Sequence, residues 1–533
     1  MKAEEFDYVI AGGGTAGCIL AARLSEDSTV RVLLLEAGGR PDTLWIRMPA
    51  GMGRLFVNPT YNWGFMTHAG EIYGRRELYL PQGKVLGGSS SINGMAFVRG
   101  HAQDYDHWRA LGAEGWDWNS VLPYFLRLEQ RLGAPAELRG TKGPLGISDP
   151  EYRHPSSAAF IEAAVAAGVP RNPDYNGASQ EGVSYLQYSI RGGKRDTAFS
   201  AWLAPVLGRA NLKVQTGAHV HRVLFENGRG TGIRYAHGGQ LQDVRATREV
   251  IVSGGAIGTP RILLHSGIGP AADLARAGVP VLVDSPGVGQ NLIDHPYLQP
   301  TYTTHEARQS LNRHLRGWRV FAHGAGWLLA GRGPLTIGAS QAAAFVRLAG
   351  EDRPGLQINF RPISFQYDAS GRMSPDPIGR LTAAVCVLRP LSRGKVSICS
   401  ADPMAAPNIH AAYLEHPVDV EAMVEGIGWM RRIFGQEPLR SIVSQEDIPG
   451  PGVHSPEQLR EFARNSSRTM CHPVGTCRMG SDEQSVVDAR LRVRGVDALR
   501  VVDASIMPDI VSGNTAAATY MIGERGADLI RAG

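Results

Sequence analysis

Residues 6–36 read FDYVIAGGGTAGCILAARLSEDSTVRVLLLE, and this stretch decides the fold. A short β-rich run, Phe6–Ala11, leads into a glycine-rich turn, and Ala16–Leu24 after it has the pattern of a helix. Val30–Leu35 is a second apolar run, which ends at Glu36. A strand, a helix and a second strand within about 30 residues predict one parallel crossover unit.

The glycine-rich turn fits the pattern G-x-G-x-x-G. Gly12 allows the tight turn, Gly14 lets the backbone approach a pyrophosphate, and Gly17 lets the helix pack closely on the strand. The helix N-terminus supplies free N–H groups and a positive dipole end to phosphate. Glu36, about 20 residues further on, can accept a hydrogen bond from a ribose 2′-hydroxyl. These features predict a dinucleotide site, but they do not separate NAD from FAD. The position of the motif at the start of the chain is typical of flavoproteins.

A second glycine cluster, Gly83–Phe97, reads GKVLGGSSSINGMAF. Gly87 and Gly88 remove side chains where the backbone passes close to a flat or charged group. A Ser-rich linker is the alternative, but linkers seldom run into Ile, Met and Phe. The run Ser89–Ser91 lacks the G-x-S-x-G elbow of a serine nucleophile, which makes a hydrolase site a weak alternative.

This cluster resembles the first signature of the glucose–methanol–choline (GMC) oxidoreductase family. Four further segments, in the same order along the chain, are similar to family segments: Gly255–Gly269 (GAIGTPRILLHSGIG), Gly287–His295 (GVGQNLIDH), Cys471–Cys477 (CHPVGTC), and Asp503–Ser505 with Gly513–Thr515. The resemblance covers residues 6–530. It implies an FAD-dependent enzyme that oxidises a CH–OH group.

The fold class implied by the resemblance is α/β with an α+β cap. A Rossmann-like FAD-binding domain would be assembled from discontinuous segments, and an antiparallel-sheet domain with helices would bind the substrate. The pattern of strands and helices agrees, because they alternate at both ends of the chain around a β-rich middle. The expected domains are 1–155, 200–300 and 485–533 for FAD, and 156–199 and 301–484 for the cap.

Several elements are expected from periodicity, with extended loops between Trp45 and Gly83. Helices are predicted over Asp104–Leu111, Trp118–Leu128 (capped by Asn119 or Ser120), Ser156–Gly168, Val418–Phe434, Pro456–Ser466 and Thr515–Ile530. Strands are predicted over Leu212–Thr216, His219–Phe225, Gly230–Tyr235, Glu249–Ser253 and Leu499–Val502.

The resemblance also implies a set of FAD-binding residues. Val220 would meet the adenine through its backbone, and Ile92 stands where some members carry a His that tethers FAD, so the FAD is expected to be noncovalent. The full expected set is Gly12, Gly14, Thr15, Ala16, Glu36, Ala37, Gly88, Ser89, Asn93, Gly94, Ala96, Val220, Asp503, Ala504, Asn514 and Thr515.

The expected catalytic residues are His472 and Asn514. Read alone, His472 is one of sixteen histidines and a structural role is the better interpretation, but the resemblance makes it the general base. Asn514 occupies a position that is His or Asn in the family, and its amide would donate a hydrogen bond to the developing alkoxide. A metal site at Cys471, His472 and Cys477 is disfavoured, because the C-x₂-C pairing and a fourth ligand are missing. No metal is expected.

The expected reaction is oxidation of a primary alcohol to the aldehyde. Family branches acting on choline, medium-chain aliphatic alcohols and L-sorbose are all similar. Pro170–Gly182 is closer to the sorbose type and His472–Arg478 to the aliphatic type, which leaves the substrate open. A dehydrogenase with a quinone-like acceptor is favoured over an oxidase that uses O₂. A non-redox or light-driven flavin lyase and a noncatalytic FAD protein are the alternatives of other classes.

Composition disfavours several other classes of protein. The 533 residues carry a net charge of +5 without a Lys/Arg-rich block, so nucleic-acid binding is not expected. Five scattered cysteines and the absence of a signal-peptide pattern favour a cytoplasmic protein. No apolar run of about 20 residues exists, so no membrane span is expected. Gly317–Ala330 is the nearest approach, and Arg319 and His323 within it favour a core or lobe-surface helix over a membrane-surface helix, although peripheral membrane contact stays open.

Overall fold

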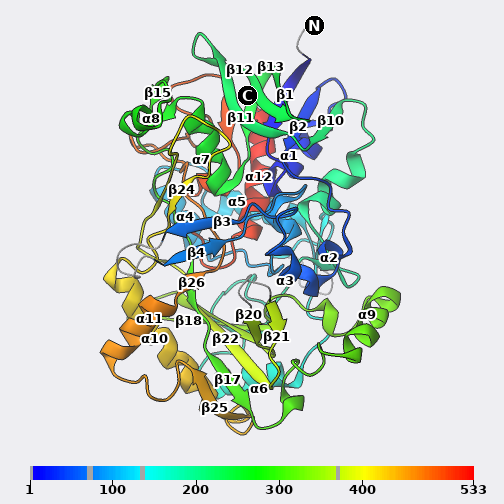
Figure 1. The fold of residues 1–533 in the computed structure, drawn as a ribbon, viewed down its shortest axis with the longest axis vertical. Helices are drawn as coiled ribbons and strands as arrows, with labels where there is room; N and C mark the ends of the chain where they lie inside the picture. The colour runs from blue at the N-terminus through cyan, green and yellow to red at the C-terminus, as the bar shows by residue number, and fades with distance from the viewer. Residues whose placement is uncertain (1–3, 69–75, 132–137, 368–372) are drawn as a thin grey trace.

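The computed structural model describes residues 4–68, 76–131, 138–367 and 373–533, and a seven-stranded sheet forms its upper end in Figure 1. The strand order is β10 (Leu212–Thr216), β2 (Val32–Glu36), β1 (Glu5–Ala11), β13 (Gln240–Val252), β12 (Arg229–His237) and β11 (His219–Glu226), with β27 (Leu499–Val501) beside β13. The group β10, β2, β1, β13 and β27 is parallel, whereas β11 and β12 form an antiparallel hairpin flap. The sheet therefore joins segments from both ends of the chain.

The parallel strands are apolar because both faces of the sheet are covered. Every residue of β2 is buried, which is the pattern of a strand inside a doubly covered parallel sheet. Helix α1 (Thr15–Leu24) packs against the C-terminal helix α12 (Ala516–Arg531), which in turn contacts α5 (Trp118–Leu128). Helix α7 (Gly255–His265) lies against β11.

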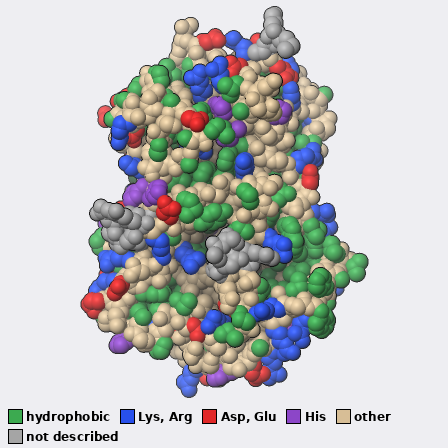
Figure 2. All heavy atoms as spheres, in the orientation of Figure 1, with side chains coloured by type: hydrophobic (Ala, Val, Ile, Leu, Met, Phe, Trp, Pro, Cys, Tyr) green, Lys and Arg blue, Asp and Glu red, His purple; other side chains and the backbone are tan. Residues whose placement is uncertain are grey.

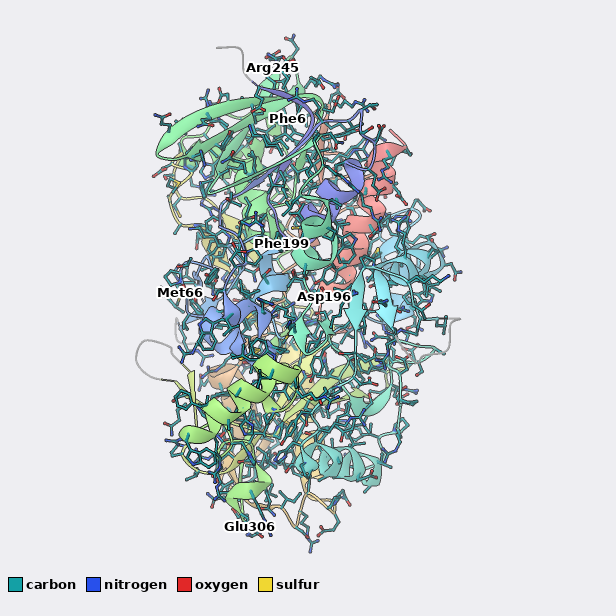
Figure 3. All side chains as sticks on the ribbon, turned by 90° about the vertical axis from the view of Figure 1, so that its right-hand side faces the viewer. Phe6, Met66, Asp196, Phe199, Arg245 and Glu306 are labelled. Atoms are coloured by element: carbon teal, nitrogen blue, oxygen red, sulfur yellow. The ribbon has the colours of Figure 1, made fainter. Side chains whose placement is uncertain are left out.

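An antiparallel sheet forms the other end of the molecule. Its strand order is β25 (Val443–Ile448), β17 (Thr301–Thr304), β22 (Arg380–Val387), β19 (Pro354–Arg361), β18 (Ala342–Arg347) and β7 (Gly182–Tyr185), with β16 (Pro296–Leu298) and β26 (Arg468–Thr469) alongside. Helices α6 (Pro155–Ala166) and α10 (Pro417–Phe434) pack on this sheet, and α11 (Pro456–Ser466) packs on α10. Figure 3 shows Phe6 and Arg245 at the end formed by the first sheet and Glu306 at the opposite end.

Shorter elements complete the two ends and the region between them. The remaining helices are α2 (Leu44–Arg47), α3 (Met52–Leu55), α4 (Ala102–Ala110), α8 (Ala271–Ala277) and α9 (Trp318–Ala330), with the short turns η1 (Pro49–Gly51), η3 (Gly88–Ser91), η7 (Pro334–Thr336) and η8 (Ala504–Ile506). Four short strands form one further sheet: β23 (Lys395–Ser397), β24 (Asn408–His410), β3 (Phe65–His68) and β4 (Glu77–Leu80). The remaining strands form two-stranded pairs: β5 (Glu129–Arg131) with β6 (Leu145–Ile147), β8 (Ile190–Arg191) with β9 (Lys194–Arg195), β14 (Ile268–Gly269) with β15 (Val283–Asp284), and β20 (Phe365–Tyr367) with β21 (Met373–Pro375).

Three local expectations need correction. The stretch Trp45–Gly83 was expected as loops, yet it contains α2, α3, β3 and β4, which are too short to give a periodic pattern; residues 69–75 lie outside the described part. Asp117 caps α5 by accepting from the N–H of Ser120, so the cap lies before the residues expected. Strand β13 begins at Gln240 instead of Glu249, because its exposed polar residues pair with β12 across a glycine turn.

The helix expected over Gly317–Ala330 is α9, and it lies on the surface (Figure 1). None of the helices in the described part of the chain is long and apolar enough to cross a membrane. The expected division of the chain into an FAD-binding and a cap domain at residues 155, 200, 300 and 485 stays a prediction, although each sheet has its own core of buried apolar side chains.

Candidate functional site

The phosphate-type loop between β1 and α1 leaves no space for side chains. Gly12 has φ +113°, and a Cβ on it would lie 2.3 Å from the carbonyl oxygen of Ser253. A Cβ on Gly17 would lie 1.9 Å from the carbonyl oxygen of Gly12. Gly14 caps α1 without a side-chain hydrogen bond, so the first N–H groups of the helix keep their hydrogen-bonding capacity for a ligand.

Glu36 ends β2 beside this loop and is buried. Its two carboxylate oxygens accept hydrogen bonds from the N–H of Gly13 at 2.8 Å and of Gly38 at 2.7 Å. Burial raises the pKa of Glu36 above its ordinary value. Its remaining lone pairs can still accept from a ribose, so Glu36 both holds the loop and faces the cavity.

The second glycine cluster packs directly on the first loop. Gly87 and Gly88 have φ of +89° and +54°, and a Cβ on Gly88 would lie 2.7 Å from the Cα of Gly14. Asn93, in the same cluster, accepts hydrogen bonds through Oδ1 from the N–H of Met95 and from Arg195. Two segments far apart in the sequence are therefore in backbone contact at one wall of the cavity.

A third segment closes the loop from the C-terminal side. Asp503 is buried; its Oδ2 accepts from the N–H of Gly255 at 2.8 Å and from the hydroxyl of Thr259 at 2.5 Å. Its Oδ1 accepts from the N–H of Ser505, so Asp503 caps the turn η8. Burial raises the pKa of Asp503. Asp503 thus fixes the N-terminus of α7 and the C-terminal segment relative to each other.

These segments line one cavity of about 1030 Å³. The structure brings all the expected site residues to it: Gly12, Gly14, Thr15, Ala16, Glu36, Ala37, Gly88, Ser89, Asn93, Gly94, Ala96, Val220, His472, Asp503, Ala504, Asn514 and Thr515. Ile92 also lines the cavity and is otherwise buried. The same cavity continues to the antiparallel sheet, where Asn359 and Arg361 of β19 line it.

Near Val220 the cavity has polar atoms without partners. A ring nitrogen of each of His219, His221 and His265 is buried and has no hydrogen-bond partner among the described residues. Burial lowers the pKa of His219 and of His265 to about 4, so both rings are uncharged at neutral pH. Buried groups of this kind are usually satisfied, and all three histidines line the cavity beside Val220.

A chain of hydrogen bonds fixes the tautomer of His472. The carbonyl of Leu388 can only accept, so His295 donates to it from Nε2 at 3.0 Å. Burial lowers the pKa of His295 to about 4, so its Nδ1 carries no proton and accepts from Nδ1–H of His472 at 3.0 Å. The Nε2 of His472 is therefore left without a proton, and the amide of Asn514 donates to it at 3.0 Å.

Burial also lowers the pKa of His472 well below its ordinary value, with the neighbouring His295 adding to the effect. The peptide N–H of His472 donates to Oδ1 of Asp294 at 2.8 Å, and Tyr413 and Thr469 donate to the other oxygen of Asp294. Burial raises the pKa of Asp294 to about 6. The residue before His472, Cys471, is in the left-handed region with φ +62°, which the bonds to Asp294 and Thr469 hold in place.

Sequence reasoning missed the partners of the expected pair. Asp294 and His295 lie in the segment Gly287–His295, which resembles a segment of the family. Nothing in the sequence says that they contact residues about 180 positions away. Gln357 was also missed; its amide donates to Oδ1 of Asn514 at 3.3 Å. The signal available was the adjacent Asp and His at the end of a glycine-rich stretch.

Comparison with known proteins agrees with this geometry. A family model described as GMC oxidoreductase matches residues 6–297, and a second model with the same description matches residues 390–523. The chain is 42% identical to an oxygen-dependent choline dehydrogenase of Rhizobium etli and 40% identical to an alcohol dehydrogenase [acceptor] of Pseudomonas putida, covering 98% of this chain and 95% of the relative in both cases. It is similar to the formate oxidase of Aspergillus oryzae RIB40, whose structure was determined to examine FAD modification, with a TM-score of 0.92, 30% identity, and 99% and 98% of the two chains covered.

The tautomer of His472 can be measured directly by ¹⁵N–¹H correlation spectra of protein labelled at histidine. In the unaltered protein we expect the proton of neutral His472 to reside on Nδ1 at pH 7, with titration well below pH 6.5. In His295→Leu the acceptor is lost, so both tautomers should be populated. His295→Gln is the matched control, since its amide oxygen keeps an acceptor.

His472→Gln identifies the signal in these spectra. A resonance of neutral His472 with its proton on Nε2 in the unaltered protein would contradict the assigned chain of hydrogen bonds. Equal tautomer populations in the Gln and Leu variants would show that His295 does not set the tautomer.

Proposed function

The chain belongs to the GMC oxidoreductase family, and on that premise we propose that it oxidises a primary alcohol to the aldehyde with noncovalently bound FAD and His472 as the base. The observation that carries the proposal is the pair formed by Nε2 of His472 and the amide of Asn514, 3.0 Å apart at the wall of the cavity. When bound, the FAD supplies the hydride acceptor at flavin N5. The alcohol carbon gives up a hydride and the hydroxyl gives up a proton, so the substrate loses two electrons in all.

The residues that line the cavity include the groups that would hold an FAD. The uncapped N-terminus of α1 matches a pyrophosphate, and Glu36 at the end of β2 matches a ribose. His219 and His265 line the cavity beside Val220, where the adenosine end would lie. Gly88 and Asn93 would then lie along the flavin ring, and Ile92 offers no nucleophile to it.

His472 is the proposed base because its Nε2 carries no proton at neutral pH; its lone pair accepts a hydrogen bond from the amide of Asn514, which a substrate hydroxyl would replace. The lowered pKa keeps the ring neutral there, so the alcohol proton can move to Nε2. Asn514 cannot accept that proton, and its role is to donate a hydrogen bond to the developing alkoxide. Gln357 holds the amide of Asn514 from the other side. A substrate hydroxyl that displaced the hydrogen bond between His472 and Asn514 would meet one acceptor and one donor.

The polar side chains of strand β19 favour one class of substrate over another. Gln357, Asn359 and Arg361 alternate along it and share one face, which leads from Asn514 outward along the cavity. Arg361 donates to Ser340 at 3.1 Å and forms no ion pair with a carboxylate among the described residues. A guanidinium beside the substrate disfavours a quaternary ammonium group, because like charges repel. We therefore propose an uncharged or anionic primary alcohol in preference to choline.

The electron acceptor is proposed to be a quinone or a similar small molecule. The relative from Pseudomonas putida is named for an unspecified acceptor, whereas the relative from Rhizobium etli is named oxygen-dependent. The alternative is an oxidase, which would oxidise the same alcohol but reduce O₂ to H₂O₂.

Anaerobic bleaching of the flavin absorbance tests the reaction. The panel contains benzyl alcohol, hydroxymethylfurfural, a medium-chain alkanol, L-sorbose and choline, and we expect bleaching by an uncharged member and slow or no bleaching by choline. Readmitting air, and then a quinone, distinguishes an oxidase from a dehydrogenase. No bleaching by any member would speak against alcohol oxidation, and illumination of the same sample would then test a light-driven lyase. Bleaching by choline alone would overturn the substrate class but not the reaction.

Replacement of the base tests the mechanism. We expect His472→Ala to slow flavin reduction roughly 10²–10⁴-fold, the range for loss of a general base, while FAD stays bound. His454→Ala is the matched control, since His454 is exposed and is not among the residues that line the cavity. In the unaltered enzyme the rate should fall only as the pH drops through the lowered pKa of His472, below 6.5. Near-normal reduction in His472→Ala would refute its role.

The mode of FAD attachment has its own test. Because buried Ile92 stands beside Asn93 and has no group that can bond to the flavin, acid precipitation should release all yellow colour into the supernatant. Mass spectrometry of the pellet should give the mass of the unmodified chain. Colour retained in the pellet would mean a covalent link at another residue.

A further inference from the structure

Helix α9 is amphipathic, but its apolar side faces away from the protein. A surface helix normally turns its apolar stripe toward the core. In α9 the side chains of Trp318, Phe321, Leu328 and Leu329 are 72%, 81%, 62% and 89% exposed, and the other three lie three, seven and eight residues from Phe321 on one side of the helix. We call these four residues the α9 face. Figure 2 shows hydrophobic side chains gathered over this part of the surface.

The opposite side of α9 is anchored, so the helix cannot simply roll inward. Trp327 is buried; its indole N–H donates to the carbonyl of Gly193 at 2.8 Å. It packs with Met48 and Leu335 in a small apolar cluster. Gly331, which ends the helix, is in such close backbone contact with Gly193 that a Cβ on Gly193 would lie 2.0 Å from its carbonyl oxygen. The α9 face is therefore held outward by the fold.

Several arginines lie close to α9 along the chain, and positive side chains lie at one edge of this face. Arg308, Arg313, Arg316, Arg319 and Arg332 lie before, within and after α9, and Figure 2 shows blue side chains directly beneath the hydrophobic patch. Arg308 and Arg332 approach Glu306 and Glu151. The other three form no ion pair with any carboxylate in the described ranges, and Arg319 lies over the ring of Trp318 at 5.5 Å. The patch is thus apolar at its centre and positively charged at its edge.

We propose that the α9 face docks the protein on an anionic lipid bilayer. An apolar side with Trp, Phe and Leu beside a border of arginines is the composition of an interfacial helix, which lies in the plane of the membrane and spans nothing. The apolar side chains would enter the boundary of the acyl chains, and the arginines would meet anionic headgroups. Trp318 sits at the edge of the face, the position that tryptophan favours at a membrane surface.

A second copy of the chain fits this face less well. A symmetric pairing of two α9 faces would bring the two arginine borders together, because such an interface uses the same patch on both subunits. Like charges in contact oppose that association, whereas an anionic surface neutralises them. The charge of the border therefore favours lipid over self-association.

A series of packed elements links α9 to the wall of the cavity. Helix α9 contacts η7, η7 contacts η1, and η1 contacts α3, whose Met52 lines the cavity. In Figure 3 the ribbon of α9 crosses the face that looks toward the viewer. The docking does not depend on the proposed reaction, but it would place a lipid-soluble acceptor within reach of the wall formed by these short elements.

Co-sedimentation with vesicles tests the proposal, with the FAD-loaded enzyme and either phosphatidylcholine alone or phosphatidylcholine mixed with phosphatidylglycerol. We expect binding to the mixed vesicles, weaker binding to the neutral ones, and loss of the difference at about 1 M salt, where the screening length is roughly 3 Å. The double variant Phe321→Gln/Leu329→Gln should weaken binding at least about tenfold. Each of Arg313→Gln and Arg316→Gln should weaken binding to the mixed vesicles about fivefold.

Leu241→Gln is the matched control, because Leu241 is also 62% exposed but lies on β13 in the sheet at the other end. Retained FAD and an unchanged circular dichroism spectrum show that the variants fold. Absence of binding to any vesicle, or equal binding by the Phe321/Leu329 variant, would overturn the proposal. A wild-type dimer in gel filtration that the same variant converts to a monomer, without vesicle binding, would assign the face to self-association instead.

Discussion

Three chain segments meet at the cavity so closely that no side chain fits between them. Gly12 lies against the carbonyl of Ser253, and Gly88 lies against the Cα of Gly14, so a Cβ at either glycine would overlap backbone atoms. Backbone atoms cannot move aside as the end of a flexible side chain can, and both glycines also have positive φ. The shape of the cavity, the exposed N-terminus of α1 and the position of Glu36 all depend on this contact.

The same contact explains how distant parts of the sequence come to share one site. Asp503 bridges the N-terminus of α7 and the turn η8, which places the C-terminal segment over the glycine loops. That segment carries Asn514, and Asn514 meets His472 across the cavity. His472 therefore belongs to one layer of the molecule and Asn514 to a segment fixed by the other. Chemistry at this site requires both sheets to be docked.

Two kinds of polar group surround His472, and each has a different structural role. The pair Leu388 and His295 controls where the proton of His472 lies, because a carbonyl can only accept and a neutral imidazole can donate from one nitrogen only. Asp294 holds the backbone of His472 and thereby the strained residue before it. Rigid surroundings of this kind favour a fixed proton-transfer geometry, since little reorganisation is needed when the substrate binds.

The sequence by itself determined the crossover unit at residues 6–36, the glycines that line the cavity, and the family. It also determined helices with strong periodicity, such as Trp118–Leu128 and Pro456–Ser466, whose bounds are the same in the structure. These depend on local spacing, which a sequence displays directly. Tertiary structure alone decided that Asp294 and His295 contact His472, because their partners lie far along the chain. It also decided which side of α9 faces outward: the sequence shows an apolar helix of modest length, but only the anchoring of Trp327 and Gly331 against Gly193 turns its apolar stripe toward solvent. Orientation of a helix is set by what it packs against, and that information is not local.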